Sequence, residues 1–252
     1  MSNKNNQHLE DYSLGKLIKE FKPQISRKLI QPMVIALFFI IGGVQLISGG
    51  FKEAWITIIG LGCIIFSGFL IYGIVDILRE RLFLYEDGLV YKSSNIIKII
   101  NFKDIVALWQ YGVQYYQYFV IPTGRKSYQY TIQTKDGNAI ILDEIIANEE
   151  LGKYLNHEVI KYLMPSLKFN YSVGQSVTFG EITISKKGIK AKNNTLPWLE
   201  VESIDISSGK VYIRKKNGSW LNKNWYVAEV STICNLYIFI EMTNTILSSV
   251  RP

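Results

Sequence analysis

Two long apolar stretches lie back to back near the start of the chain. The first covers residues 29–51 and the second residues 54–75, and neither contains a charged side chain. Only Lys52 and Glu53 separate them. A helix rises about 1.5 Å per residue, so about 20 apolar residues cross the roughly 30 Å core of a bilayer. The pattern therefore predicts a transmembrane helical hairpin over residues 29–78, with helices at about 30–50 and 54–76.

Basic residues flank the hairpin and predict its orientation. Arg27 and Lys28 precede the first helix, Arg79 and Arg81 follow the second, and the connecting turn carries a single lysine. Cytoplasmic flanks of membrane helices carry excess Lys and Arg. We therefore expect both termini, including the polar and basic segment 1–28, in the cytoplasm. A cleaved signal peptide is the competing interpretation, because small residues stand at the end of the first apolar stretch. The polar segment 1–28 before that stretch is, however, long for the start of a signal peptide.

The composition of the two spans favours a membrane anchor over a pore or transporter. Charged side chains inside a membrane mark ion and substrate pathways, and none occurs between residues 29 and 75. Small residues allow close helix contact, either within the hairpin or between copies of the chain in self-association. The glycines of the spans are Gly42, Gly43, Gly60, Gly62, Gly68 and Gly73.

After Arg81 the pattern changes to short strands that end in a helix. Strands are predicted at residues 82–85, 89–91, 97–100, 105–109, 128–132 and 139–142. Turn residues such as Glu86-Asp87-Gly88 separate them. A helix then begins at the N-cap residue Asn148, carries apolar residues at helical spacing, and is predicted to end at Pro165.

The same order returns about one domain later. Strands are predicted at residues 182–185, 189–191, 201–206, 210–214 and 220–230. A helix opened by Ser231 or Thr232 follows, with Tyr237 on its apolar stripe. A repeat of this length indicates tandem domains, here at 81–165 and 169–250. Each is expected to be a small β-barrel or sandwich closed by a C-terminal helix, which makes the chain an α+β protein.

This order resembles the pleckstrin-homology-like (PH-like) fold. The fragments that carry the resemblance are residues 182–188, 196–198, 201–206, the hairpin 210–218 and the helix entry 231–235. They are similar to an uncharacterised bacterial family of membrane proteins with PH-like cytoplasmic domains, a domain of unknown function. The resemblance implies a multi-pass protein of the bacterial cytoplasmic (inner) membrane and leaves the function open.

Positive charge is concentrated in the last third of the chain. The net charge is +7, and residues 166–252 carry eleven Lys and Arg against six Asp and Glu. PH-like domains that hold phosphoinositides use basic residues near their first hairpin, so the resemblance implies contact with anionic lipid head groups here. The alternative is a solvated lysine-rich surface. The basic set consists of Lys186, Lys187, Lys190, Lys192, Lys210, Arg214, Lys215 and Lys216.

An aromatic segment in the first domain predicts a surface for a protein partner. Its residues are Tyr111, Tyr115, Tyr116, Tyr118 and Phe119. Exposed aromatic side chains are enriched at interfaces; the alternative is that they pack along a strand. Nucleic acid is not an expected partner, because the aromatic and basic residues belong to different domains.

No catalytic motif stands out in the sequence. The chain has two histidines and two cysteines, Cys63 and Cys234, without metal-ligand spacing, and no glycine-rich phosphate loop. We therefore expect no metal and no cofactor. The predicted function is a membrane-anchored binding or scaffolding module of the cytoplasmic side, not an enzyme. The alternative is an accessory subunit of a membrane enzyme or transporter.

Overall fold

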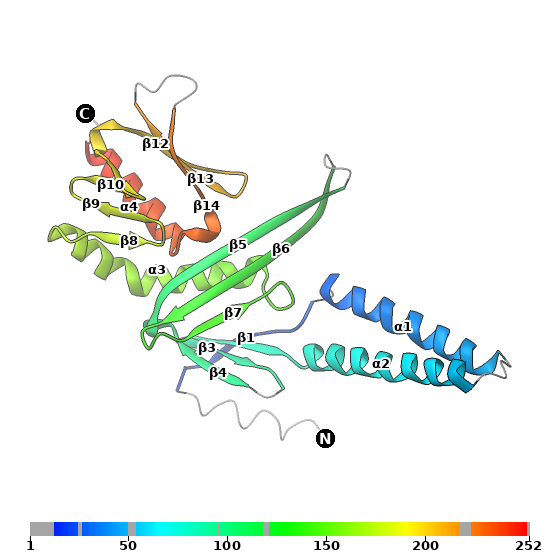
Figure 1. Ribbon diagram of the computed structural model, residues 1–252. Helices are drawn as coiled ribbons and strands as arrows, with labels where there is room; N and C mark the ends of the chain where they lie inside the picture. Colours follow the sequence, from blue (N-terminus) through cyan, green and yellow to red (C-terminus); the bar gives the residue numbers. More distant parts are fainter. Residues whose placement is uncertain are drawn as a thin grey trace. The chain divides into compact units, whose positions relative to one another are not determined.

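The chain folds as two compact units of α+β structure. The computed structural model describes residues 13–24, 27–49, 54–94, 96–117, 121–216 and 223–250 (Figure 1). One unit consists of Met1–Ile99 with Glu144–Ile146, and the other of Ile100–Asp143 with Ala147–Pro252. Two apolar helices come first, β-sheets follow, and a helix ends the described chain, which confirms the predicted fold class at this level.

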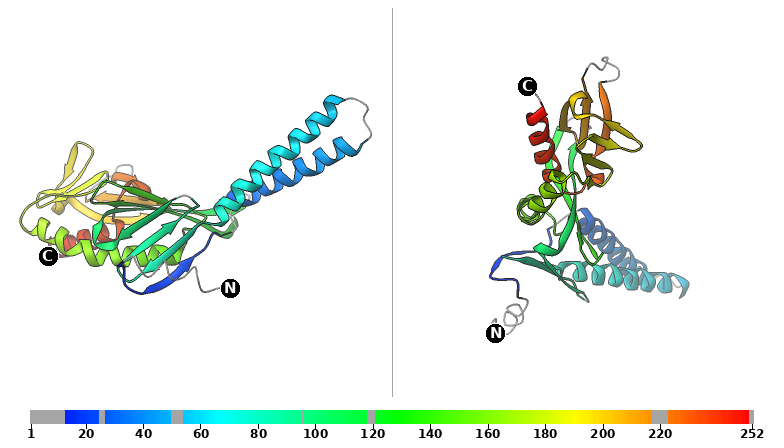
Figure 2. Two further views of the ribbon diagram at one scale, coloured as in Figure 1. Left: turned by 90° about the horizontal axis from the view of Figure 1, so that it is seen from below. Right: turned by 90° about the vertical axis from the view of Figure 1, so that its left-hand side faces the viewer.

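The two predicted apolar helices are present as α1 (Arg27–Ser48) and α2 (Ala54–Leu78). Both are long and apolar enough to cross a membrane. They lie side by side as a hairpin in every view (Figure 2). Their closest approach is at Gly43 and Gly60, where an added Cβ would lie 2.8–2.9 Å from the facing backbone carbonyl oxygen. Glycine is required at this crossing because a larger side chain would push the helices apart.

The first sheet contains a strand that the sequence pattern does not reveal. Its four strands are β1 (Leu17–Phe21), β2 (Arg81–Tyr85), β3 (Gly88–Lys92) and β4 (Ile97–Asn101), paired in that order. Strand β1 lies in the segment predicted only as a polar lead. Four of its five residues are exposed and Phe21 alone is buried, so it lacks the alternation that marks a half-buried strand. Its pairing with β2 connects the two ends of the helical hairpin.

The second sheet and its helix belong to the other unit. A 3-10 turn, η2 (Phe102–Asp104), leads into β5 (Ile105–Gln117), β6 (Ile121–Thr134), β7 (Ala139–Leu142) and helix α3 (Glu149–Ser172). The prediction that this helix ends at Pro165 is wrong. Pro165 is exposed, and contacts beyond it stabilise the rest of the helix. Lys168 forms an ion pair with Glu241 at 2.9 Å, and the ammonium group of Lys186 lies 4.4 Å from the centre of the Tyr171 ring. Tertiary contacts outweigh the single backbone hydrogen bond that proline removes.

The remaining elements form two more sheets and the last helix. Strands β8 (Val177–Phe179), β9 (Ile182–Ser185), β10 (Gly188–Ala191) and β11 (Asn194–Leu196) form a four-stranded sheet. After η3 (Trp198–Glu200), strands β12 (Val201–Ser207), β13 (Lys210–Lys215) and β14 (Asn224–Glu229) form a three-stranded sheet. The turn η4 (Val230–Thr232) precedes α4 (Leu236–Val250), which begins later than predicted. Within the described residues the sheets are open, and none closes on itself into a barrel.

The chain runs twice through one order of elements. A four-stranded sheet, a 3-10 turn, a three-stranded sheet and a helix occur as β1 to α3 and again as β8 to α4. In the second passage, Phe179 pairs with Ile182 across the two-residue turn Gly180-Glu181. In the first, the equivalent pair is Phe21 with Leu82, and all four of these apolar residues are buried. The helical hairpin therefore occupies the position of a β-turn.

Candidate functional site

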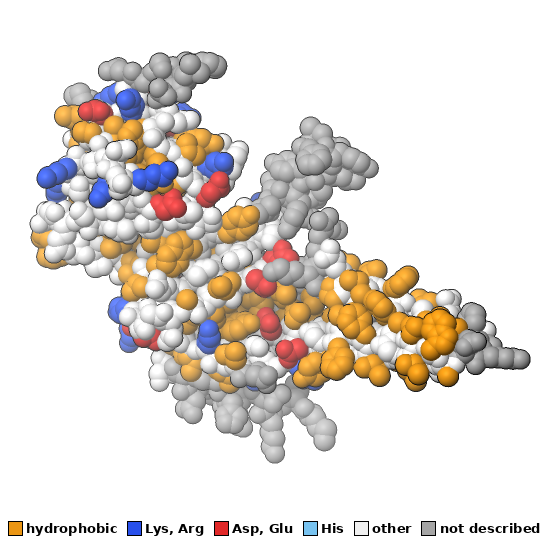
Figure 3. Space-filling view, in the orientation of Figure 1, with side chains coloured by type: hydrophobic (Ala, Val, Ile, Leu, Met, Phe, Trp, Pro, Cys, Tyr) orange, Lys and Arg blue, Asp and Glu red, His pale blue; other side chains and the backbone are white. Residues whose placement is uncertain are grey.

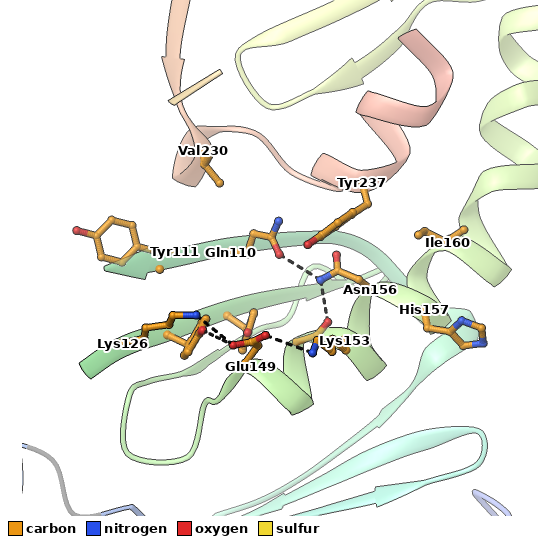
Figure 4. A pocket seen from close by; sticks show the side chains of 14 residues that line it. Gln110, Tyr111, Lys126, Glu149, Lys153, Asn156, His157, Ile160, Val230 and Tyr237 are labelled. Atoms are coloured by element: carbon orange, nitrogen blue, oxygen red, sulfur yellow. Dashed lines mark hydrogen bonds and ion pairs between the residues drawn. The ribbon is translucent and has the colours of Figure 1, made fainter. Parts of the chain in front are cut away.

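A cleft of about 640 Å³ opens on the unit formed by residues 100–143 and 147–252. Figure 4 shows its walls: β5 and β6 supply Gln110, Tyr111 and Lys126, helix α3 supplies a row of polar residues, and Tyr237 projects from α4. The row on α3 is Glu149, Lys153, Asn156 and His157. The cleft thus combines elements of the first passage with the start of the last helix.

Glu149 is the centre of a hydrogen-bonded cluster on one wall. Its carboxylate accepts a bond from the Tyr128 hydroxyl at 3.0 Å and lies 3.4 Å from Lys126 Nζ and 3.2 Å from Lys153 Nζ (Figure 4). The hydrogen bonds from Tyr128 and Lys153, together with the charge of Lys126, hold the pKa of Glu149 below its ordinary value. The carboxylate therefore stays ionised and fixes the position of both lysines.

Tyr130 forms the floor beside this cluster. Its hydroxyl donates to the carbonyl oxygen of Asn148 at 3.0 Å, and burial raises the pKa of Tyr130 above its ordinary value. A Cβ at position 152 would lie 2.0 Å from the Tyr130 hydroxyl oxygen, so only glycine fits there. Asn148 also caps α3, because its side chain accepts from the backbone N–H of Leu151 at 2.8 Å. The predicted N-cap is confirmed, and it ties the helix start to the sheet.

The opposite end of the cleft is held by two amide side chains. Asn156 Nδ2 donates to Gln110 Oε1 at 3.1 Å and to the carbonyl oxygen of Gly152 at 2.7 Å. His157 lies at the rim with 75% of its side chain exposed, 3.8 Å from a carboxylate oxygen of Glu158. Tyr237 is 54% exposed, so the prediction that it lies on the buried stripe of the last helix is wrong.

Asn235 places the start of α4 next to β5. Its side chain accepts from the backbone N–H of Leu108 at 2.9 Å and donates to the carbonyl oxygen of Val106 at 3.1 Å. Its own backbone N–H donates to the Leu108 carbonyl oxygen at 2.8 Å. Asn235 is 6% exposed and has φ 51°, so one residue pairs with the edge of β5 as a short strand would. This contact brings Tyr237 into the cleft.

The cleft presents tyrosine rings, amides and a cluster of two lysines around one carboxylate. Such groups can form hydrogen bonds and stacking contacts. In the part of the chain that the structure describes, no group of three or more His, Cys, Asp or Glu could hold a metal ion.

The predicted basic set does not form one cluster of free charges. Lys210 and Arg214 each lie 3.3 Å from a carboxylate, of Glu229 and Asp205 respectively. Two others lie over tyrosine rings, Lys186 over Tyr171 at 4.4 Å and Lys192 over Tyr226 at 5.9 Å. Four show no ion pair with another described residue: Lys187, Lys190, Lys215 and Lys216. Ion pairs between described residues therefore neutralise two of the eight charges, and two more are directed onto neutral rings.

The predicted aromatic surface is described only in part. Tyr111 is 49% exposed and lines the cleft. The backbone of Tyr115 and Tyr116 belongs to β5, while their side chains, and all of Tyr118 and Phe119, lie outside the described residues.

Most residues of the cleft could not be identified from the sequence. The position of Glu149 directly after the N-cap is typical of a helix-start carboxylate and does not reveal its contacts with Tyr128 and the two lysines. Gln110, Asn156 and Tyr237 come from three elements, and no spacing connects them. The one available signal is the concentration of tyrosine and amide residues along residues 110–130.

Comparison with known proteins identifies the family but not an activity. No curated protein was found to match the chain. A family model described as "Family of unknown function (DUF6585)" matches residues 1–252. The chain belongs to this family of unknown function.

Proposed function

We propose that this protein is a membrane-anchored binding module that performs no reaction of its own. The observation that carries the proposal is the cleft, in which hydrogen bonds already hold polar side chains in place around an accessible space. Such preorganised polar groups lower the entropic cost of binding a ligand. The hairpin supplies the anchor.

The surface of the hairpin supports the membrane location. Apolar side chains cover its visible face, shown in orange in Figure 3. Phe38 and Phe69 are each 73% exposed, which is unfavourable in water and favourable in lipid. The basic flanks favour both termini in the cytoplasm, and the resemblance implies a bacterial cytoplasmic membrane.

The repeated order of elements supports two PH-like domains. Each passage ends in a helix that follows the sheets, as the resemblance implies. The division at 81–165 and 169–250 remains part of this proposal, as does the absence of a metal or cofactor. Strand β1 would add residues 17–21 to the first domain.

The anchor is tested by extraction of membranes with alkaline carbonate. We expect the full chain to stay in the pellet, whereas a double variant with Phe38→Lys and Phe69→Lys is released or fails to insert. Phe169→Lys is the matched control, because Phe169 is 64% exposed on α3, outside the hairpin. Release of the unaltered chain by carbonate would contradict the proposal.

Binding at the cleft is tested by photo-crosslinking in membranes. A benzophenone amino acid at Tyr111 should yield one discrete product, and the same group at Leu199, 68% exposed on η3, should not. A product that contains a subunit of a membrane enzyme or transporter would favour the accessory-subunit alternative. No product specific to Tyr111 would count against a binding role.

Anionic lipid contact is a second proposal, supported by the exposed lysines of the β9–β10 hairpin. Spin labels at Lys187 and, as control, at Asp87 of the β2–β3 hairpin compare the two tips in nanodiscs. We expect the label at 187 to become less accessible to water in anionic than in zwitterionic nanodiscs, and high salt to reverse this. Equal behaviour at both tips would reject lipid contact.

A further inference from the structure

Three polar atoms in the cleft lie close to one another and are not engaged in hydrogen bonds with other described residues. They are Gln110 Nε2, Asn156 Oδ1 and Tyr237 Oη, which Figure 4 shows on the same side of the Gln110–Asn156 contact. Gln110 Oε1 and Asn156 Nδ2 are already bonded to each other. None of the three converging atoms has a hydrogen-bond partner among the described residues.

The orientation of both amides follows from their contacts. The Gly152 carbonyl can only accept a hydrogen bond, so Asn156 must direct its NH₂ group toward it, at 2.7 Å. The same NH₂ group lies 3.1 Å from Gln110, which must therefore present its oxygen. As a result Gln110 offers its NH₂ donor to the cleft and Asn156 offers its carbonyl acceptor. The Gly152 carbonyl oxygen, in the first turn of α3, thereby sets the orientation of both amides.

The amide end of the cleft favours a neutral ligand. Lys126 and Lys153 share the single Glu149 carboxylate, which leaves one net positive charge on that wall. At the opposite end, the acceptor Asn156 Oδ1 would repel a carboxylate. A volume of about 640 Å³ falls within the roughly 300–1,000 Å³ of small-molecule sites. The half-exposed ring of Tyr237 borders the unused amide atoms and suits a flat ligand.

We propose that the cleft binds a small, neutral, planar ligand that carries a carboxamide or lactam group. Its N–H donates to Asn156 Oδ1, its C=O accepts from Gln110 Nε2, and its ring stacks near Tyr237. The Tyr237 hydroxyl supplies an additional hydrogen bond to the same group. This inference rests on the proposed binding function, because it names the ligand class of that site.

The test compares three probes with one ring and different polar groups. Saturation-transfer NMR is recorded on the full chain in nanodiscs with benzamide, with acetophenone, which lacks the N–H, and with benzoate, which is charged. We expect benzamide to bind at least about fivefold more tightly than either, since a site that holds an unpaired polar group rejects an analogue that cannot satisfy it. Equal binding of the three probes would overturn the proposal.

Variants locate the selectivity. Gln110→Glu replaces the donor by an acceptor while keeping the bond from Asn156, and Tyr237→Phe removes only the hydroxyl. Gln110→Glu should abolish the preference for benzamide, and Tyr237→Phe should weaken the binding of benzamide about fivefold. Gln129→Leu, an exposed glutamine of β6 outside the cleft, is the control and should change nothing. A folded Gln110→Glu protein that still prefers benzamide would overturn the proposal.

Different results would contradict the carboxamide ligand and the general binding function. Carbonate extraction of the same preparations reports on the anchor, and crosslinking at Tyr111 reports on binding in general. If the chain stays in the membrane and the Tyr111 product forms, but the probes bind equally, only the carboxamide assignment is wrong. Loss of the Tyr111 product together with all probe binding removes the binding function as well.

Discussion

The two passages of the chain through one order of elements differ most at their first turn. In the second passage, Gly180 and Glu181 join β8 to β9, and Gly180 has φ 68°, with no room for a side chain beside the Thr232 carbonyl oxygen. In the first, the helical hairpin joins β1 to β2 at the equivalent position. The sheet accepts either connection because only the ends of the paired strands must meet. A long apolar helical hairpin can thus be added without changing the strand order.

The residue before each closing helix shows a second difference. Asn148 and Asn235 both precede a helix, at α3 and α4. Asn148 has extended backbone geometry and caps its own helix, whereas Asn235 is left-handed and its side chain pairs with β5 instead. The same residue type in the same place therefore serves local capping in one passage and long-range attachment in the other.

The largest expected effect comes from making the first turn like the second. Replacement of residues 22–81 by Gly-Glu should give a chain that stays in the supernatant without detergent and keeps its β-sheet signal in circular dichroism. The reason is that Phe21 and Leu82 pair directly and that Leu14 packs on Phe83 and Tyr85, independently of the helices. An unfolded product would mean that the helices, rather than β2, hold β1 in place.

The two asparagines should differ in their effect on stability. Asn235→Ala leaves the buried N–H of Leu108 and the carbonyl of Val106 without partners, which should lower the free energy of unfolding by about 3 kcal/mol. Asn148→Ala should cost about 1 kcal/mol, the typical value of an N-cap. Denaturant unfolding of the full chain in detergent measures both.

Asn235→Gly is the control for backbone strain. Glycine accepts the left-handed conformation, so its loss of stability reports the missing hydrogen bonds, and any further loss in the alanine variant comes from backbone strain. Equal losses for Asn148→Ala and Asn235→Ala would show that the contact with β5 adds nothing to a cap.

The smallest effect concerns the acidic first turn that α3 has and α4 lacks. Glu149 has a lowered pKa, so the stability it contributes is present above the ordinary pKa of about 4.3 and is lost as the pH falls through the lower folded value. We expect Glu149→Gln to lower the Tm slightly at pH 7 and by less as the pH falls through the acidic range.

Tyr128→Phe sharpens this measurement. Loss of the hydroxyl removes the main cause of the shift, so the pH at which the Glu149 contribution disappears should move upward. An unchanged midpoint would show that the lysines alone lower the pKa.

Much of the fold can be predicted from local sequence patterns, and the predictions that were wrong have a common cause. Strands β2, β3, β4, β7, β9 and β10 and the cap at Asn148 were all predictable, because alternation and turn residues act over a few positions. Strand β1 was not, since its partner lies beyond the hairpin. Pro165 did not end α3, because contacts with distant residues sustain the helix there. The candidate site was missed almost entirely, since its walls come from four separate elements.

The sequence by itself determined that two helices are long and apolar enough to span a membrane and that a repeated β-rich region follows. These properties depend on composition and on the spacing of neighbouring residues. Only the tertiary structure decided that the hairpin replaces a β-turn, that Asn235 attaches the last helix to β5, and that Gln110, Asn156 and Tyr237 share one cleft. Those facts depend on which distant segments pair, and pairing is set by the complementarity of whole surfaces rather than by local periodicity.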